Sequence, residues 1–452
     1  MNQSRRGFLR HAAAAGIVAG GGPLIARRGF AQDVPKVAPI SMVINQSPWF
    51  PAFSALVERY ESETGNTIAF DVNPYAGALE KVRNSLRAAE GQYDLLAIDN
   101  NWMVETFAGG FLMPVDELDP SYQLDPAVNT YDGTIFWNGE TRRFDPDGGR
   151  LMGVPINGNV EVLFYRADLY EEHGLEVPET WEQLLDNVVA LNDPPGLYGF
   201  VHRDDRTSAT ADFSNYMFSF GGRVFEDRSA GNYHVTFNSP TNLDALHYYR
   251  ELGEQGGYPS PGSVSQAQMI QHLLTGKAAH AIGIVGAWAD VDDPQKSAVV
   301  GQLSAALIPR ASRAGGQHAS RAGHWIGAIA GNVPKERQDA ALAFLKWFIM
   351  RPQQIEFTAE GGVPTRTDIV GPELAQDPRQ RFLEALAANS QVAKMVYTVP
   401  EARQLFAITD LRLNEAIIGA LGPAEALNTA AAEIEAVMRD AGYETGRLPD
   451  LG

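Results

Sequence analysis

The sequence contains no cysteine, which excludes disulfide bonds, thiolate metal sites and a lipid-anchored cysteine at the mature N-terminus. Positive charge is also scarce, because 36 lysines and arginines stand against 55 acidic residues and the formal net charge is −19. This acidic balance argues against nucleic acid or an anionic membrane as a partner. No segment reaches the ~20 consecutive apolar residues that a membrane-spanning helix needs, so we expect no membrane-embedded part.

Signatures of catalysis are missing as well. The chain has no GxSxG elbow, no P-loop, no HExxH pair and no dinucleotide-binding glycine pattern. Its nine histidines are scattered, and His318 and His324 are six residues apart, which places them on no shared helical face. We therefore expect no catalytic residues, no metal site and no cofactor.

The first thirty residues have the pattern of an export signal. Twin arginines, Arg5 and Arg6, precede an apolar run rich in alanine and glycine at 12–26, and Ala31 offers a cleavage point. This pattern is typical of a bacterial twin-arginine signal over residues 1–31, and a short amphipathic N-terminal helix is the alternative. Cleavage would remove five arginines and no acidic residue, which brings the net charge to −24. We expect a free protein in the periplasm.

The whole chain of 452 residues is 44% hydrophobic and 20% charged, as in ordinary globular proteins, and its length allows two or three domains. The ranges 40–45, 67–72 and 94–98 are predicted strands, and 51–65 and 77–91 are predicted helices with apolar residues at helical spacing. This alternation predicts an α/β fold, with a mainly parallel sheet and helices on both faces.

A second set of helices and strands follows an irregular region rich in Asp, Gly and Pro. Residues 153–166 read as extended, and Thr180 with Gln183 predicts a helix that begins with a capping box. Ser239 as N-cap and Pro240 at the first helical position predict another helix. The pattern therefore predicts a second α/β unit.

Aromatic and polar side chains gather where predicted strands end, first at 45–50, 73–75 and 99–102. In open parallel sheets, ligands bind beyond the carboxyl ends of the strands. Aromatic rings pack against the C–H faces of a polyhydroxylated ligand, while Asp, Asn and Arg bond its hydroxyls. Further clusters lie at 156–159, 202–205, 213–222, 285–288, 323–325 and 361–366. The alternative for each cluster is a core aromatic beside a helix cap, and Asp99 in particular could cap the next helix.

Several segments carry a family resemblance in a fixed order. They include FSALVERYESETG (53–65), YDLLAIDNNWMVETFAGGFLMPVDEL (93–118) and GVPINGNVEVLFYRADLYEEHGLEVPETWEQLL (153–185). FSFGGRVFED (218–227) and AALAFLKWFIMRPQQ (340–354) follow. Together they resemble the extracellular solute-binding proteins of ABC sugar importers, the group that includes maltose-binding protein.

The resemblance implies two α/β lobes, each with a mainly parallel sheet, joined by three hinge crossings at about 160, 285 and 326. One lobe would take residues 38–160 and 285–325, and the other 161–284 and 326–452. The ligand would lie in the cleft and contact both lobes only when they close, so binding would shift the population toward the closed form. The permease subunits of the transporter would recognise that form.

The resemblance also implies ligand contacts. Trp49, Tyr75, Asp99 and Asn101 would line the first lobe's side of the cleft, and Asn157 and Asn159 would lie at the hinge. The other candidates match regions that line the cleft in relatives: Arg203, Asp204, Tyr216, Trp288, His324, Trp325 and Arg366. Trp288, Trp325 or Tyr75 would stack on the ligand and Asp99 would accept its hydroxyls. Arg366 could instead form a structural salt bridge.

We therefore expect a monomeric periplasmic binding protein that delivers a neutral carbohydrate or polyol to an ABC importer and does no chemistry. Two alternatives stay open. The ligand could be charged: a polyamine would suit the acidic balance, while Arg203 and Arg366 could grip a uronate or a sulfonated sugar. The protein could also be an exported carbohydrate-active enzyme, which would need two carboxylates facing each other at a set distance.

Overall fold

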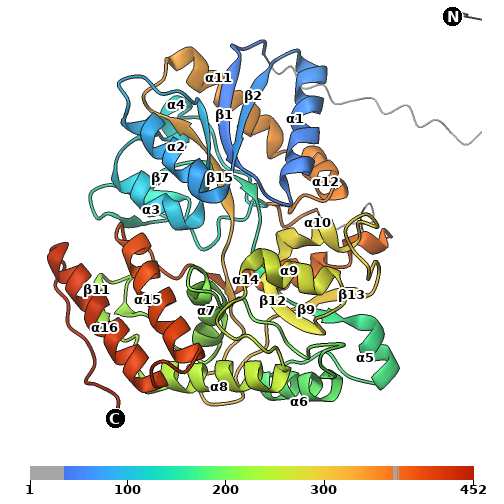
Figure 1. Cartoon of the computed structure of the whole chain (residues 1–452). Helices are drawn as coiled ribbons and strands as arrows, with labels where there is room; N and C mark the ends of the chain where they lie inside the picture. The colour runs from blue at the N-terminus through green and yellow to red at the C-terminus, as the bar shows by residue number, and fades with distance from the viewer. Residues whose placement is uncertain (1–34, 370–373, 375) are drawn as a thin grey trace, which may run out of the picture. The chain divides into compact units, whose positions relative to one another are not determined.

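The structure is a computed structural model that describes residues 35–369, 374 and 376–452 (Figure 1). The predicted export signal at 1–31 lies outside the described residues. Within the described ranges, no helix combines the length and the apolar character required to cross a bilayer.

The first sheet has six strands and gathers segments from distant parts of the chain. Its order is β2 (Ile68–Asn73), β1 (Ile40–Asn45), β3 (Leu95–Asp99), β15 (Trp325–Ala330) and β4 (Leu112–Met113), and β8 (Val154–Asn157) also pairs with β15. The pairs β1–β2 and β1–β3 are parallel, whereas β15 runs antiparallel to β3, β4 and β8. The first lobe is thus a mainly parallel sheet with one reversed strand.

Helices α1 (Phe50–Thr64), α2 (Tyr75–Arg87) and α3 (Asn100–Ala108) each follow one of the parallel strands, as the sequence predicts. The apolar positions of α1 at helical spacing, such as Phe53 and Tyr60, are buried, and Gly65 ends the helix in the left-handed conformation with φ of 70°. Glycine adopts this conformation without steric cost, which explains the stop.

Two later helices complete the first lobe. Rings of α11 (Lys335–Phe348) pack on α1, with Phe53 and Phe344 centred 6.0 Å apart and Tyr60 and Trp347 5.1 Å apart. Helix α12 (Arg351–Ala359) follows and begins with Pro352 in its first turn. Pro352 therefore lies in the first turn of α12, where its missing N–H costs no helical hydrogen bond.

The second sheet has the order β12 (His280–Ile284), β9 (Glu161–Arg166) and β13 (Leu303–Ala306). Strand β9 runs antiparallel to both neighbours. The expectation of a mainly parallel sheet is therefore confirmed for the first sheet. It is wrong for the second sheet, whose two strand pairs are both antiparallel. The apolar segments look alike in either direction, so their periodicity does not reveal which strand is reversed.

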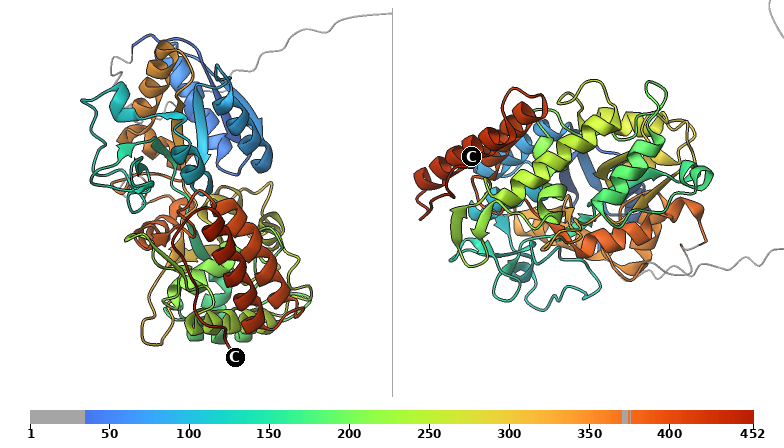
Figure 2. Two further views of the ribbon diagram at one scale, coloured as in Figure 1. Left: turned by 90° about the vertical axis from the view of Figure 1, so that its left-hand side faces the viewer. Right: turned by 90° about the horizontal axis from the view of Figure 1, so that it is seen from below.

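Helices and a hairpin surround the second sheet. They are α5 (Ala167–His173), α6 (Trp181–Leu191), α7 (Ala209–Ser219), α8 (Pro240–Gly256), α9 (Gln266–Leu274), α14 (Leu383–Gln391), α15 (Ala402–Ile417), α16 (Pro423–Asp440) and the hairpin β10 (Phe225–Asp227) with β11 (Asn232–Val235). Helices α15 and α16 lie side by side (Figures 1 and 2). The predicted capping box of Thr180 and Gln183 and the predicted N-cap Ser239 are confirmed.

The remaining elements are short. They are α4 (Val115–Leu118), β5 (Phe136–Asn138), β6 (Arg143–Phe144), β7 (Arg150–Leu151), a 3₁₀ turn at Val285–Ala287, α10 (Trp288–Val291), β14 (Ser320–Arg321), a 3₁₀ turn at Pro378–Gln380 and β16 (Ala393–Lys394). Strands β5, β6 and β7 form a small antiparallel sheet within the region expected to be irregular.

The strand pairings correct the expected lobe boundaries. Residues 303–306 were expected in the first lobe, but they form β13 of the second sheet. Residues 326–330 were expected in the second lobe, but they belong to β15 of the first sheet, and α11 packs there too. The chain therefore crosses between β8 and β9, between β14 and β15, and between α12 and α14, and does not cross at 285. An extended apolar segment does not encode its partner, which is why the sequence could not place these strands.

Gly158 lies at the first crossing and has no room for a side chain. Its backbone N–H donates to the Val363 carbonyl, 3.0 Å away, and an added Cβ would lie 1.9 Å from the Pro364 carbonyl oxygen and 2.8 Å from the Tyr131 hydroxyl. The close approach of two backbone segments therefore requires glycine here.

We predict that Gly158→Ala lowers the free energy of unfolding by about 1–3 kcal/mol, because the backbone of 363–364 must move to admit the methyl group. Urea denaturation measures this change. Gly139→Ala is the matched control, since a Cβ at Gly139 would meet nothing within 4 Å. Equal stability of the two variants would contradict the proposed crowding.

Candidate functional site

Four aromatic side chains meet at one edge of the first sheet. Trp325, the first residue of β15, has its ring centre 5.1 Å from Trp102 of α3, 6.0 Å from Tyr75 and 6.1 Å from Trp49. Tyr75 and Trp102 are 4.7 Å apart. Trp49, Trp102 and Trp325 are buried, whereas Tyr75 is 44% exposed. The cluster therefore presents one open ring supported from behind by indoles. We call Trp49, Tyr75, Trp102 and Trp325 the aromatic cluster.

Asp99 is the polar residue that contacts the aromatic cluster. Its Oδ1 accepts three hydrogen bonds: from the Tyr75 hydroxyl at 3.0 Å, the Asn101 backbone N–H at 3.0 Å and the Asn101 side-chain amide at 2.7 Å. Asp99 is thus the N-cap of α3 and a neighbour of the exposed ring at once. No hydrogen bond from a described residue reaches Oδ2.

Burial raises the pKa of the Asp99 carboxyl, while Arg321 and the hydrogen bonds from Asn101 and Tyr75 oppose that rise. Arg321 reaches this group through Asn101, whose Oδ1 accepts from Arg321 Nη2 at 3.4 Å. The carboxylate therefore lies beside a cation as well as a ring.

Glu161, at the start of β9, is the centre of a buried charge network that we call the Glu161 network. Its carboxylate is 3.4 Å from the guanidinium of Arg321 and 3.5 Å from that of Arg203, and it accepts a short hydrogen bond from Asn215. Burial raises the pKa of Glu161, and the two arginines act against that rise. Burial lowers the pKa of Arg203, which Glu161 opposes. An isolated buried carboxylate is costly, so the two cations are needed to keep it charged.

Glu161, Arg321 and Trp102 are absent from the residues predicted from sequence. A signal for Glu161 existed, because it is a charged residue inside the apolar run of a buried strand, and such residues need a partner. Arg321 carried no such signal, since it lies between small residues in a segment that reads as a loop. Trp102 was visible in the 99–102 cluster, and its place on the buried side of α3 explains its contact with Trp325.

The two asparagines expected at the hinge hold the crossing segments together. Asn157 Oδ1 accepts from the Asn159 backbone at 3.1 Å, and Asn159 Oδ1 accepts from the Gly286 backbone at 2.8 Å. The Asn159 carbonyl also accepts from the Gly323 backbone at 3.0 Å. Asn157 Nδ2 is buried without a hydrogen-bond partner among the described residues. Their contacts therefore support a role in the crossing, and Asn157 keeps a buried donor without a partner among the described residues.

His324 is buried and neutral. Its ring stacks on Tyr131 at 4.0 Å with an interplanar angle of 6°, and its Nε2 lies 3.1 Å from the Thr134 hydroxyl. Burial, with a smaller contribution from Arg321, lowers the pKa of His324 to about 3. The residue packs behind Trp325 and shows no exposed surface.

Four other expected ligand contacts have partners within the chain, and their contact with a ligand stays a prediction. Asp204 accepts from the backbones of Gly262 and Val264, which fixes a loop. Tyr216 is buried in the core of the second lobe. Its ring stacks 4.3 Å from Trp181.

Trp288 and Arg366 also interact with other residues of the chain. Trp288 donates through Nε1 to the Arg379 carbonyl at 2.7 Å, and the Arg381 guanidinium lies 4.7 Å above its ring. Arg366 forms ion pairs with Asp125 and Asp368, each at 2.7 Å. Arg366 therefore forms the structural salt bridge that was the alternative. For Asp204, Tyr216, Trp288 and Arg366 the sequence pattern therefore identified a side chain that is buried or paired, but it could not show which residue is the partner.

A metal is not indicated in this part of the chain: within residues 35–369, 374 and 376–452, no group of three or more His, Cys, Asp or Glu side chains is arranged to hold an ion. The geometry instead offers an exposed ring, an open carboxylate oxygen, an amide and a guanidinium. Such groups bind C–H faces and hydroxyls.

Comparison with known proteins identifies the family. The sequence profile of bacterial extracellular solute-binding proteins matches residues 45–355. The chain belongs to this family.

Individual relatives are distant. A probable amino-acid ABC transporter periplasmic-binding protein of Sinorhizobium fredii is 21% identical, and the match covers 92% of this chain and 94% of the relative. A mannitol-binding protein of Pseudomonas aeruginosa is 26% identical, and the match covers 59% of this chain and 58% of that protein. The chain thus matches less than two thirds of the mannitol-binding relative.

The fold has solved counterparts. The crystal structure of an ABC transporter solute-binding protein from Agrobacterium radiobacter, in complex with ribitol, superposes with a TM-score of 0.74 at 23% identity. The superposition covers 89% of this chain and 99% of that one. At this identity the likeness establishes a shared two-lobed fold, which confirms the expected architecture.

We predict that His324→Asn flattens the pH dependence of stability below neutrality. The unfolded chain binds a proton at His324 with the ordinary pKa of about 6.5, while the folded protein does so only near 3. Stability therefore falls as pH falls through this window, by up to about 1.4 kcal/mol per pH unit for one such group. Urea unfolding between pH 4.5 and 6.5 measures the slope.

The control for this experiment is His173→Asn, because His173 is exposed at the end of α5. Its slope should match that of the unmodified protein. His280, whose pKa burial lowers to about 4, keeps part of the slope in both variants. An unchanged slope in His324→Asn would show that His324 is not buried in the neutral form.

Proposed function

We propose that the protein is the periplasmic binding component of an ABC importer and that it binds a neutral carbohydrate or polyol. The observation that carries this proposal is the pairing of the exposed Tyr75 ring with the Asp99 carboxylate, whose Oδ1 accepts three hydrogen bonds and whose Oδ2 accepts none from the described residues. A ring beside a fixed acceptor matches a ligand that alternates C–H faces with hydroxyls.

The wider surroundings of Asp99 agree with a polyhydroxylated ligand. Asn101 supplies an amide and Arg321 a guanidinium next to the carboxylate, so both donors and acceptors are present. Trp325 and Trp102 support the Tyr75 ring from behind, which favours a single orientation of that ring. Pre-positioned groups lose less conformational entropy on binding.

The names of relatives support the same ligand class. One relative is a mannitol-binding protein, and one structural counterpart was solved with ribitol; both ligands are neutral polyols. Another relative is named as a probable amino-acid ABC transporter periplasmic-binding protein, so the names of relatives do not all point to one ligand class. The choice of a neutral polyhydroxylated ligand for this chain therefore rests on the site geometry, which pairs a ring with a carboxylate. No step of this function requires a catalytic group, and we infer that the protein is not an enzyme.

We further propose that ligand closes the lobes about the three crossings. Groups from both sides already approach each other, because Arg321 of β14 donates to Asn101 of α3. A ligand that contacts Asp99 and the Glu161 network together would bind the closed form better and shift the population toward it. The closed form is the one that permease subunits would recognise, and the binding protein itself would act as a monomer.

We predict that Asp99→Ala weakens ligand binding by one to a few kcal/mol, since it removes the hydroxyl acceptor and leaves the Tyr75 hydroxyl without its partner. A thermal-shift panel of mannitol, ribitol, glucose and maltose would first identify a ligand that raises the melting temperature. Calorimetry would then compare the variants. Asp339→Ala, at an exposed carboxylate of α11, is the control and should bind normally.

The same panel separates the alternatives. It should include glucuronate, a sulfonated sugar and putrescine, because a charged ligand would be favoured if Arg321 or Asp99 acted as a counter-ion. Stabilisation by charged compounds alone would refute the neutral class. Release of a new product from a glycoside by the purified protein would refute the binding function altogether.

Export is a separate proposal that rests on the sequence. We propose that residues 1–31 direct the protein through the twin-arginine pathway to the periplasm. Replacing Arg5 and Arg6 together by lysine should then leave uncleaved protein in the cytoplasm, as fractionation and immunoblotting would show. Arg27→Lys with Arg28→Lys is the matched control and should be exported. Normal export of the Arg5/Arg6 variant would exclude this pathway.

A further inference from the structure

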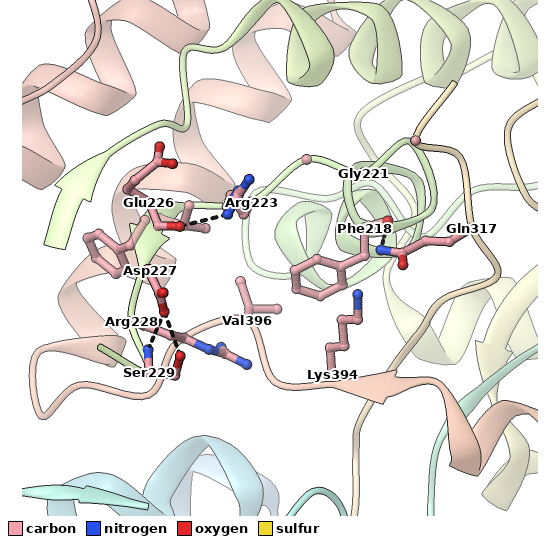
Figure 3. A pocket seen from close by; sticks show the side chains of 14 residues that line it. Phe218, Gly221, Arg223, Glu226, Asp227, Arg228, Ser229, Gln317, Lys394 and Val396 are labelled. Atoms are coloured by element: carbon pink, nitrogen blue, oxygen red, sulfur yellow. Dashed lines mark hydrogen bonds between the residues drawn. The ribbon is translucent and has the colours of Figure 1, made fainter. Parts of the chain in front are cut away.

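A pocket of about 410 Å³ lies in the second lobe, apart from the aromatic cluster. It is formed by the end of α7, the β10 hairpin, the loop at 315–317 and strand β16 (Figure 3). It shares no lining residue with the aromatic cluster or with Asp99. Strand β16 of the pocket pairs with β14, where Arg321 is opposite Lys394, and helix α7 also contacts β14. Their side chains have different partners, since Arg321 reaches Glu161 and Lys394 lies 5.8 Å from the centre of the Phe218 ring.

Three cations line this pocket without an acidic partner. Arg223 donates to the Glu226 carbonyl and Arg228 to the Met395 carbonyl, each at 2.7 Å. Among the described residues, no carboxylate lies within 4.0 Å of the charged nitrogens of Arg223, Arg228 or Lys394. This is unusual in a chain with an excess of acidic residues, where most arginines could find a carboxylate.

The acidic residues nearby do not neutralise the pocket. The Asp227 carboxylate accepts hydrogen bonds in its own turn, where Oδ1 accepts from the backbones of Ser229 and Ala230 and from the Ser229 hydroxyl. It also attracts Arg223, but at a distance beyond an ion pair. Glu226 is exposed, and its side chain extends away from Lys394 in Figure 3. Asp132 attracts both Arg228 and Lys394, but at a distance beyond an ion pair.

The cations also destabilise one another. Burial lowers the pKa of Lys394, and the positive charges of Arg228 and Arg223 lower it further, against the attraction of Asp132. Burial likewise lowers the pKa of Arg228. A negative group among the three would relieve this repulsion and supply the missing hydrogen-bond acceptors.

The rest of the pocket wall is apolar. Phe218 and Val396 are buried in the protein core on one side and face the pocket on the other, between the Lys394 and Arg228 side chains in Figure 3. A guanidinium presents a planar fork that matches two oxygens of a carboxylate, sulfate or phosphate. The ring and the isopropyl group offer contact to a short carbon skeleton.

We propose that this pocket is a second binding site, specific for an anionic group with tetrahedral or planar oxygens, held by Arg228, Lys394 and Arg223. The anion is either inorganic phosphate or sulfate, or the acidic group of a small organic molecule whose carbon part lies on Phe218 and Val396. The site is independent of the carbohydrate site, and its occupation does not require the function proposed above.

Calorimetric titration at constant ionic strength tests the proposal, with inorganic phosphate and phenyl phosphate as the two probes. We expect saturable binding of at least one probe by the unmodified protein. Tighter binding of phenyl phosphate would identify an organic anion as the ligand type, and equal binding an inorganic one. The absence of saturable binding for both probes would overturn the proposal.

Substitutions of the three lining cations test whether the anion binds in this pocket. Lys394→Gln should weaken the affinity about tenfold, because it removes a charged hydrogen-bond donor and loses no hydrogen bond recorded in the structure. Arg228→Gln should weaken the affinity at least as much. Arg223→Gln should also weaken it, and because Arg223 is exposed this substitution leaves the protein core intact. Arg87→Gln, an exposed arginine of α2, is the control and should bind as the unmodified protein does. Unchanged affinity in both Lys394→Gln and Arg223→Gln would place the anion elsewhere and refute the site.

Discussion

The buried carboxylate of Glu161 is the constraint on which the joint between the lobes depends. It lies at the first position of β9, where the chain has just left the first sheet, and water does not reach it. Its charge is stable only if Arg321 and Arg203 are both in place. These residues come from three separate segments, so the electrostatic requirement of one side chain orders all three.

The same residues connect the second sheet to the edge of the first sheet that carries the aromatic cluster. From Glu161 the contacts pass through Arg321 to Asn101, from there to Asp99, and then to the Tyr75 hydroxyl. Each link is a hydrogen bond or an ion pair between neighbours. A change of charge or position at one end therefore has a direct physical route to the other, across the point where the chain crosses between lobes.

Sequence patterns predicted the local structure well and the tertiary partners poorly. The first three strands, the helices that follow them, and the caps at Thr180 and Ser239 depend on short-range periodicity and on local hydrogen bonds, and they were correct. The placement of β13 and β15 was wrong, because the partner of an apolar strand is decided by contacts far along the chain. The cluster at 99–102 was located correctly at the strand end, and the alternative that Asp99 caps the next helix is confirmed. The sequence did not show that the Asn101 side-chain amide also donates to Asp99. Whether Asp99 contacts a ligand stays a prediction.

Strand β15 runs in the opposite direction to its neighbour β3 in the first sheet. Because it runs against β3, its first residue, Trp325, is paired with the last residue of that strand, Asp99. The indole is therefore anchored in a hydrogen-bonded ladder, whereas the three other aromatic side chains are carried by helices or by the turns that lead into them. A small shift of α1, α2 or α3 would therefore move the helix-borne rings and leave the sheet intact, whereas Trp325 cannot move without breaking its pairing with Asp99.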